Sequence, residues 1–183
     1  FLRDGFYPGL TKNSGTPITP SSTLMRAFLI NSAVKPDETI SRDGPNNEVG
    51  FGIPCLDSVF GFKGSGLRIV DNVRMNSYTH HVYHVFLESN EFDFVATMAY
   101  LDPPLNPDND NHLFADLDLF VKSPNGKFYV GNSCNGVADS DSFSSAEKVV
   151  IGKEEIPEKG GDFEIHITST EYALDSQKVT YSL

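Results

Sequence analysis

From residue 67 onward, apolar and polar residues alternate along a series of short segments, and this pattern restricts the possible folds more than any other feature. Such alternation is typical of β-strands, and the segments Pro-Pro at 103–104, Pro-Asn-Gly at 124–126 and Lys-Gly-Gly at 159–161 predict turns between them. The predicted strands are 67–72, 79–87, 93–101, 115–122, 127–130, 147–151, 161–169 and 178–182. Because no helical pattern separates them, we predict a mainly β domain over residues 63–183, an antiparallel β-sandwich or jelly roll of about eight strands.

Residues 1–62 follow a different pattern, which contains one convincing helix. Residues 22–33 predict a helix that begins after a Ser or Thr N-cap. The apolar residues that cover much of its surface are Leu24, Ala27, Phe28 and Ile30. Since a helix that is apolar nearly all round is buried in something larger than itself, we expect this one to have further partner surfaces. The segment 35–48 predicts an exposed loop, 57–60 a single helical turn and 62–66 a linker.

The charge of the chain excludes one class of partner. There are 14 Lys and Arg against 25 Asp and Glu, a formal net charge of −11. Such a surface repels phosphate backbones, so we expect no nucleic-acid partner. No apolar run reaches the ~20 residues of a membrane-spanning helix, so we expect no membrane span. The first residues lack the basic start and apolar core of a signal peptide, which predicts an excised or processed piece whose targeting signal lies upstream.

The two cysteines, Cys55 and Cys134, lie far apart in the sequence. They form neither a CxxC pair nor a cluster with histidines, which disfavours a zinc site. Two alternatives remain: a disulfide that joins the two parts of a secreted chain, or two buried thiols. The thiols are favoured because nothing local brings these positions together.

Acidic residues in and near two predicted loops indicate a possible cation site. Asp108 and Asp110 precede the predicted strand that carries Asp116 and Asp118, and Asp139 lies in a later loop. Calcium takes roughly six to eight hard oxygen ligands, often carboxylates. A strand places Asp116 and Asp118 on one face, where their charges repel unless a cation, a basic group or water separates them. These five residues are therefore candidate calcium ligands, although Asp also serves as an ordinary turn residue.

Several blocks of the sequence resemble, in order, the C-terminal part of subtilisin-like serine peptidases (subtilases). TPSSTLMRAFLINSA at 19–33 is similar to the helix near the end of the family's catalytic domain. GFGIPCL at 50–56 is similar to the segment after that helix, with Phe51 in place of the usual Trp. The blocks that resemble the jelly-roll domain of one branch of the family are TMAYLDPP at 97–104, ADLDLFV with SPNG at 115–126, YVGN at 129–132, AEKVVI at 146–151 and GDFEI at 161–165.

The resemblance implies two incomplete or accessory parts of one enzyme. Residues 1–62 would be the helix-containing end of an α/β catalytic domain, and residues 63–183 an accessory jelly roll. The catalytic Ser, His and Asp and the oxyanion-hole Asn would all lie upstream of Phe1, so this chain alone would be inactive. Its partners would be the upstream catalytic domain and, for the whole enzyme, peptide or protein substrates. Such peptidases are secreted or belong to the endomembrane system or cell surface, and their jelly rolls often carry structural calcium.

The five histidines do not match the family's catalytic positions. They are His80, His81, His84, His112 and His166. His80 and His84 lie on a predicted strand, which suits an exposed or partly packed face. The resemblance therefore assigns no catalytic role to any residue of this chain.

A free-standing binding module for carbohydrate or protein is the alternative function. Sugar sites present exposed aromatic rings as stacking platforms. The candidates here are Tyr78, Tyr83, Tyr100, Phe120 and Tyr129, and the chain contains no Trp. Exposed and clustered tyrosines would favour the binding module, whereas a large apolar patch formed by residues 19–62 would favour the peptidase.

Overall fold

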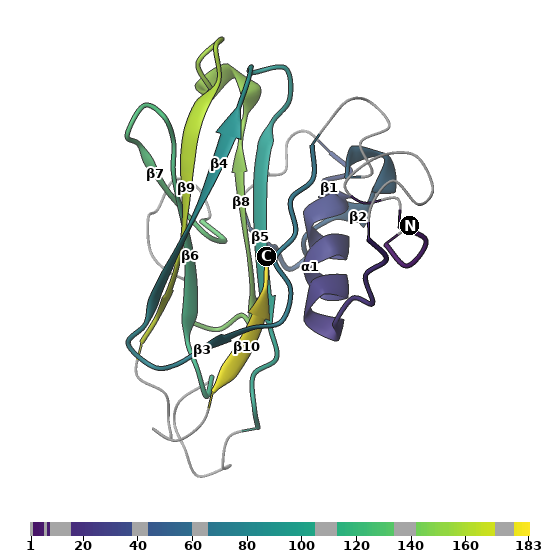
Figure 1. The fold of residues 1–183 in the computed structure, drawn as a ribbon, viewed down its shortest axis with the longest axis vertical. Coiled ribbons are helices and arrows are strands. Elements are labelled where there is room, and N and C mark those ends of the chain that lie inside the picture. The colour runs from purple at the N-terminus through teal and green to yellow at the C-terminus, as the bar shows by residue number, and fades with distance from the viewer. Residues whose placement is uncertain are drawn as a thin grey trace.

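Most of the chain lies in extended strands that pair into sheets, as the computed structural model shows (Figure 1). The structure describes residues 2–5, 7, 16–37, 44–59, 66–104, 113–133, 142–170 and 178–183. Its helical elements are α1 (Ser22–Ser32) and the short 3-10 helices η1 (Leu56–Ser58) and η2 (Lys153–Glu155). The strands are β1 (Ala33–Val34), β2 (Ile53–Pro54), β3 (Val73–Met75), β4 (His80–Leu87), β5 (Phe94–Tyr100), β6 (Leu117–Lys122), β7 (Phe128–Val130), β8 (Ala146–Ile151), β9 (Gly161–Ser169) and β10 (Val179–Ser182).

Strands β3 to β10 form two four-stranded antiparallel sheets that face each other. The sheet next to α1, here the helix-side sheet, has the order β3-β10-β5-β8. The other, here the outer sheet, has the order β4-β9-β6-β7. The short strands β1 and β2 pair separately. Inner faces of the two sheets share one apolar core, whose fully buried members include Met98, Leu119, Ile151, Phe163, Ile167 and Tyr181. This is the β-sandwich expected from the alternating sequence.

The predicted elements agree with the structure except at the first strand. The predicted helix 22–33 corresponds to α1, and each predicted strand from 79–87 onward overlaps one of β4 to β10. The predicted strand 67–72 is wrong, because the strand in this region is β3 at Val73–Met75. Asn72 has a φ of 57°, in the left-handed region, and this conformation interrupts the extended backbone just before β3.

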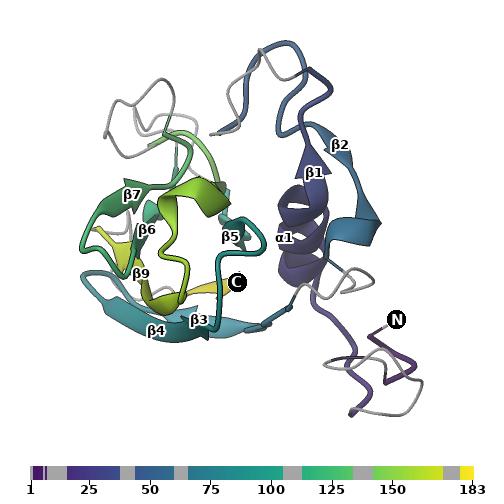
Figure 2. The same cartoon turned by 90° about the horizontal axis from the view of Figure 1, so that it is seen from above.

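The helix-side sheet is covered on both faces, and its sequence reflects this. The inner side chains of β5 lie in the sandwich core, while Ala99 on its opposite face packs with Ala27 of α1. A strand that is buried on both faces does not need to alternate apolar and polar residues, and the sequence of β5 is FVATMAY. Figure 2 shows α1 between the sandwich and β2, with β1 continuing from the end of the helix. Among the described residues, no helix is long and apolar enough to cross a membrane.

Candidate functional site

The beginning of α1 is tied to the sandwich by hydroxyl and carboxylate groups. The Ser21 Oγ caps the helix by accepting from the Leu24 N–H at 3.0 Å, and it donates to Asp71 Oδ1. The Ser21 N–H donates to Asp71 Oδ2 at 3.0 Å. From β10, Ser182 Oγ donates to Asp71 Oδ1 at 2.8 Å and lies 2.7 Å from Thr23 Oγ1. A single carboxylate therefore joins the helix cap to the last strand of the helix-side sheet.

The ionisation of Asp71 follows from these contacts. Burial favours the neutral acid, but hydrogen bonds from Ser21, Ser182 and the backbone of Asn72 favour the carboxylate and outweigh it. The pKa of Asp71 therefore lies below its ordinary value of 3.8. Because the folded pKa is lowered, its stabilising contribution is present above the unfolded pKa and is lost as the pH falls through the folded pKa.

Replacing Ser21 by Ala is expected to lower the free energy of unfolding by about 1–2 kcal/mol at pH 7. The change removes the cap of α1 and the side-chain hydrogen bond from Ser21 to Asp71, while the bonds to Asp71 from the Ser21 backbone and from Ser182 remain. Urea unfolding measures the loss. Ser22→Ala is the matched control, because Ser22 is the exposed first residue of α1 and should change stability by less than about 0.5 kcal/mol. Equal losses in the two variants would contradict a stabilising role for the Ser21–Asp71 contact.

The end of α1 is held by a buried lysine from β8. Lys148 Nζ donates to the carbonyl oxygen of Ile30 at 3.0 Å and to that of Ala33 at 2.7 Å. These carbonyls belong to the last turn of the helix, which has few internal donors and a partial negative charge. Burial, with a smaller contribution from the positive charge of Lys35, lowers the pKa of Lys148 to about 8. The helix is thus attached to the sandwich at both ends.

Between its ends, α1 approaches the sheet closely. Ala27 packs with Ala99 of β5 and Ala146 of β8, and small side chains at all three positions allow the helix to lie near the backbone of the sheet. Asn31 Nδ2 donates to Thr97 Oγ1 of β5 at 3.2 Å. We infer that α1 and the helix-side sheet form one packed unit in this chain, even though the resemblance assigns them to different domains.

The side of this unit away from the sandwich exposes apolar residues. Met25 and Leu29 lie one turn apart on α1, and Val34 pairs with Ile53 across β1 and β2. The five members of what we call the apolar face are Met25 (44% exposed), Leu29 (45%), Val34 (48%), Ile53 (60%) and Leu56 (42%). They come from adjacent elements, since α1 contacts both β2 and η1. The sequence predicted a helix apolar nearly all round; the sandwich covers one side of it, and the apolar face is the other.

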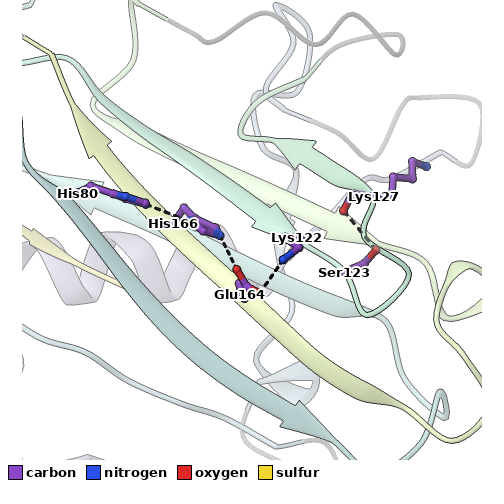
Figure 3. A network of polar contacts seen from close by, with 6 residues as sticks. All are labelled: His80, Lys122, Ser123, Lys127, Glu164 and His166. Carbon is purple, nitrogen blue, oxygen red and sulfur yellow. Dashed lines mark hydrogen bonds and ion pairs between the residues drawn. The ribbon is translucent and has the colours of Figure 1, made fainter.

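A second group of functional side chains lies on the solvent face of the outer sheet. His80 of β4 and His166 of β9 stack with ring centroids 5.1 Å apart, and His80 Nε2 lies 2.9 Å from His166 Nδ1. His166 Nε2 lies 3.2 Å from Glu164 Oε2, and Lys122 Nζ of β6 lies 2.8 Å from Glu164 Oε1 (Figure 3). The hydrogen bond from Lys122 is the largest cause of the lowered pKa of Glu164, which therefore carries a negative charge at neutral pH. We call these four residues the histidine network.

Sequence reasoning placed His80 on an exposed or partly packed face but did not bring it next to His166. The two residues are 86 positions apart, and they meet because β4 and β9 pair in a register that sets Val82 opposite His166. The alternation of side chains along each strand, which turns both histidines toward solvent, could be predicted from the sequence. Their proximity depended on which strands pair.

The candidate calcium ligands fall mostly outside the described residues. Three of the five, Asp108, Asp110 and Asp139, lie outside the described residues. Asp118 is buried on β6, and Asp116 precedes that strand, half-buried. Their carboxylates suit calcium, but among the described residues no three His, Cys, Asp or Glu side chains are grouped as a metal would require. The five-residue calcium site therefore stays a prediction.

Asp102, at the end of β5, has a structural role. Its two carboxylate oxygens accept the backbone N–H groups of Phe114 and Ala115, each at 2.9 Å. These bonds fix the start of the chain segment that leads into β6. These two backbone hydrogen bonds account for both oxygens of the Asp102 carboxylate.

The remaining sequence predictions concern cysteines and tyrosines. Cys55 is half-buried, and Cys134 lies outside the described residues, so the choice between a disulfide and two thiols stays open. The candidate aromatic platform does not form a cluster of exposed rings: Tyr78 is 71% exposed, but Tyr100 is buried, and Tyr83, Phe120 and Tyr129 are half-buried.

Comparisons with protein-family models and with curated proteins found no match to this chain.

Proposed function

We propose that this chain is the C-terminal portion of a subtilisin-like serine endopeptidase, in which it stabilises the catalytic domain and shapes access of peptide substrates. The observation that carries the proposal is the position of α1. One side of the helix is fastened to the sandwich through Ser21, Asp71 and Lys148, and the other side continues into the apolar face. A helix attached in this way would act as a bridge between the sandwich and a second body that covers the apolar face.

The strand order supports a jelly-roll assignment for residues 63–183. If β3 to β10 are renumbered 1 to 8, the helix-side sheet reads 1-8-3-6 and the outer sheet reads 2-7-4-5. Each sheet therefore joins strands from both halves of the segment, as expected when two Greek keys are wound together. The ordered sequence blocks favour the same architecture.

The occupant of the apolar face would be the catalytic domain that carries the Ser, His and Asp. In this proposal residues 1–62 complete the α/β core of that domain, and their exposed apolar side chains become interior ones. The sandwich would then stabilise the enzyme through α1 rather than through chemistry of its own. The proposed location, secreted or endomembrane, follows the family resemblance.

Placing aspartate in the apolar face is expected to separate the two bodies. Leu29→Asp and Ile53→Asp would each weaken association with the upstream polypeptide at least tenfold, because a buried carboxylate without a partner is strongly unfavourable. The measurement is co-purification of the chain with that polypeptide, followed by peptide hydrolysis with and without a serine-directed inhibitor. Val82→Asp is the matched control, since Val82 is a comparably exposed strand residue of the outer sheet and should change neither association nor hydrolysis. Unchanged association in both test variants would overturn the proposal.

A further inference from the structure

The histidine network has a chemical organisation that the proposed peptidase role does not require. Its residues come from β4, β6 and β9, which are neighbouring strands of the outer sheet. They lie on the face opposite the sandwich core, away from α1 (Figures 1 and 3). The inference below rests on this network alone and is independent of the peptidase proposal.

The carboxylate of Glu164 selects one protonation form of the His166 ring. His166 Nε2 lies 3.2 Å from Glu164 Oε2, so a proton on Nε2 faces a negative charge. In the neutral ring the other nitrogen, Nδ1, then keeps its lone pair. That lone pair points toward His80 Nε2, 2.9 Å away. Two imidazole nitrogens thus converge at the solvent face of the outer sheet, across the pairing of the edge strand β4 with β9.

We propose that His80 Nε2 and His166 Nδ1 bind a divalent transition-metal ion of the Zn²⁺, Cu²⁺ or Ni²⁺ class. Imidazole is a preferred ligand of these ions and a poor one for Ca²⁺ or Mg²⁺. Two nitrogens that each lie ~2.0–2.1 Å from a tetrahedral ion are ~3.3 Å apart, so ion binding requires the observed 2.9 Å contact to open and the rings to turn until both lone pairs point at the ion. His80 is exposed, and its ring can turn to supply that opening and to release the proton from Nε2.

The rest of the network supplies the support that metal-binding histidines usually have. A ligating histidine commonly donates its second N–H to a carboxylate, which fixes the ring and raises the basicity of the ligating nitrogen. Here Glu164 Oε2 lies 3.2 Å from His166 Nε2, a charge contact without hydrogen-bond geometry, and Lys122 holds Glu164 from the neighbouring strand at 2.8 Å. Glu164 and Lys122 are therefore positioning residues and do not bind the ion themselves.

The site offers two protein ligands and leaves the other coordination positions open. Within the described ranges, no group of three or more His, Cys, Asp or Glu side chains could surround a metal ion. Water, or a donor atom from another molecule at this surface, would complete the coordination. The expected behaviour is that of an accessible site of moderate affinity, unlike a closed structural zinc centre.

Isothermal titration of the full chain with Zn²⁺, and separately with Ni²⁺, tests the proposal at pH 7.5 in a non-chelating buffer. We expect one ion bound per chain. His80→Asn and His166→Asn should each weaken binding at least tenfold, and Glu164→Gln should weaken it by roughly tenfold through loss of the supporting carboxylate. His84→Asn is the matched control: His84 is exposed on the same face of β4, opposite Glu164, and its loss should change affinity less than twofold.

Two further readouts make the outcomes distinguishable. Circular dichroism of each variant identifies any loss of fold, and His80→Asn is the decisive variant because His80 is exposed and its replacement leaves the core intact. The spectrum of the Co²⁺-loaded chain reports whether a cysteine thiolate is a ligand. The proposal is overturned if neither ion binds saturably, if folded His80→Asn binds as tightly as the parent chain, or if the Co²⁺ spectrum shows thiolate ligation.

Discussion

Replacing Phe163 by Ala is expected to lower the free energy of unfolding by about 3–5 kcal/mol. Phe163 of β9 is fully buried between the two sheets, and its ring stacks on that of Phe94 from β5, with centroids 4.3 Å apart. Truncation removes apolar area that had been taken out of water and leaves a cavity that strands paired on both sides cannot close. Because one core holds both sheets, we expect a single unfolding transition at a lower urea concentration.

Phe86→Ala provides the matched control for this prediction. Phe86 is also a strand phenylalanine of the outer sheet, but it points to solvent and is 63% exposed. Its truncation should change stability by no more than about 0.5 kcal/mol. Urea unfolding followed by circular dichroism compares the two variants. Equal losses would mean that the two sheets do not pack through the core described above.

Lys148→Met is expected to abolish a rise in stability between pH 8 and pH 10.5. Lys148 has a pKa of about 8 in the folded chain, mainly because it is buried, against an ordinary value of 10.5. Between these values the unfolded chain holds one proton more than the folded chain at this site, so the free energy of unfolding rises with pH. Over this window the rise amounts to roughly 3 kcal/mol, and below pH 8 it is absent.

The neutral amine retains N–H groups for the carbonyl oxygens of Ile30 and Ala33, so deprotonation removes the cost of a buried charge without breaking the attachment of α1. The quantity to compare is the difference in unfolding free energy between the parent chain and Lys148→Met at pH 7, 8, 9 and 10. Groups common to both proteins cancel in this difference. Lys153→Met, at an exposed lysine of η2, should give a difference that is independent of pH. Parallel pH curves for the parent and Lys148→Met would contradict the prediction.

Local sequence signals were sufficient for most of the secondary structure. The alternation of residues 161–169 predicted β9 with its observed bounds, and the Ser-rich entry to residues 22–33 predicted the capped start of α1. Both are short-range effects: one depends on the period of the side chains and the other on a hydroxyl within reach of the first turn. The prediction failed at 67–72, where a left-handed Asn72 ends the extended run, because the sequence pattern does not reveal the backbone angle of a single residue.

The candidate sites likewise depend partly on local sequence signals and partly on contacts that the sequence does not reveal. The sequence by itself determined which residues are apolar, acidic or imidazole-bearing, and on which side of its own strand or helix each one lies. Only the tertiary structure decided that Lys148 caps the end of α1 and that His80 lies 2.9 Å from His166. Both contacts join residues separated by more than 80 positions, and they form only when particular elements pair in a particular register. Strand pairing is a property of the whole core, since a shift of one residue would turn every side chain of a strand to the other face.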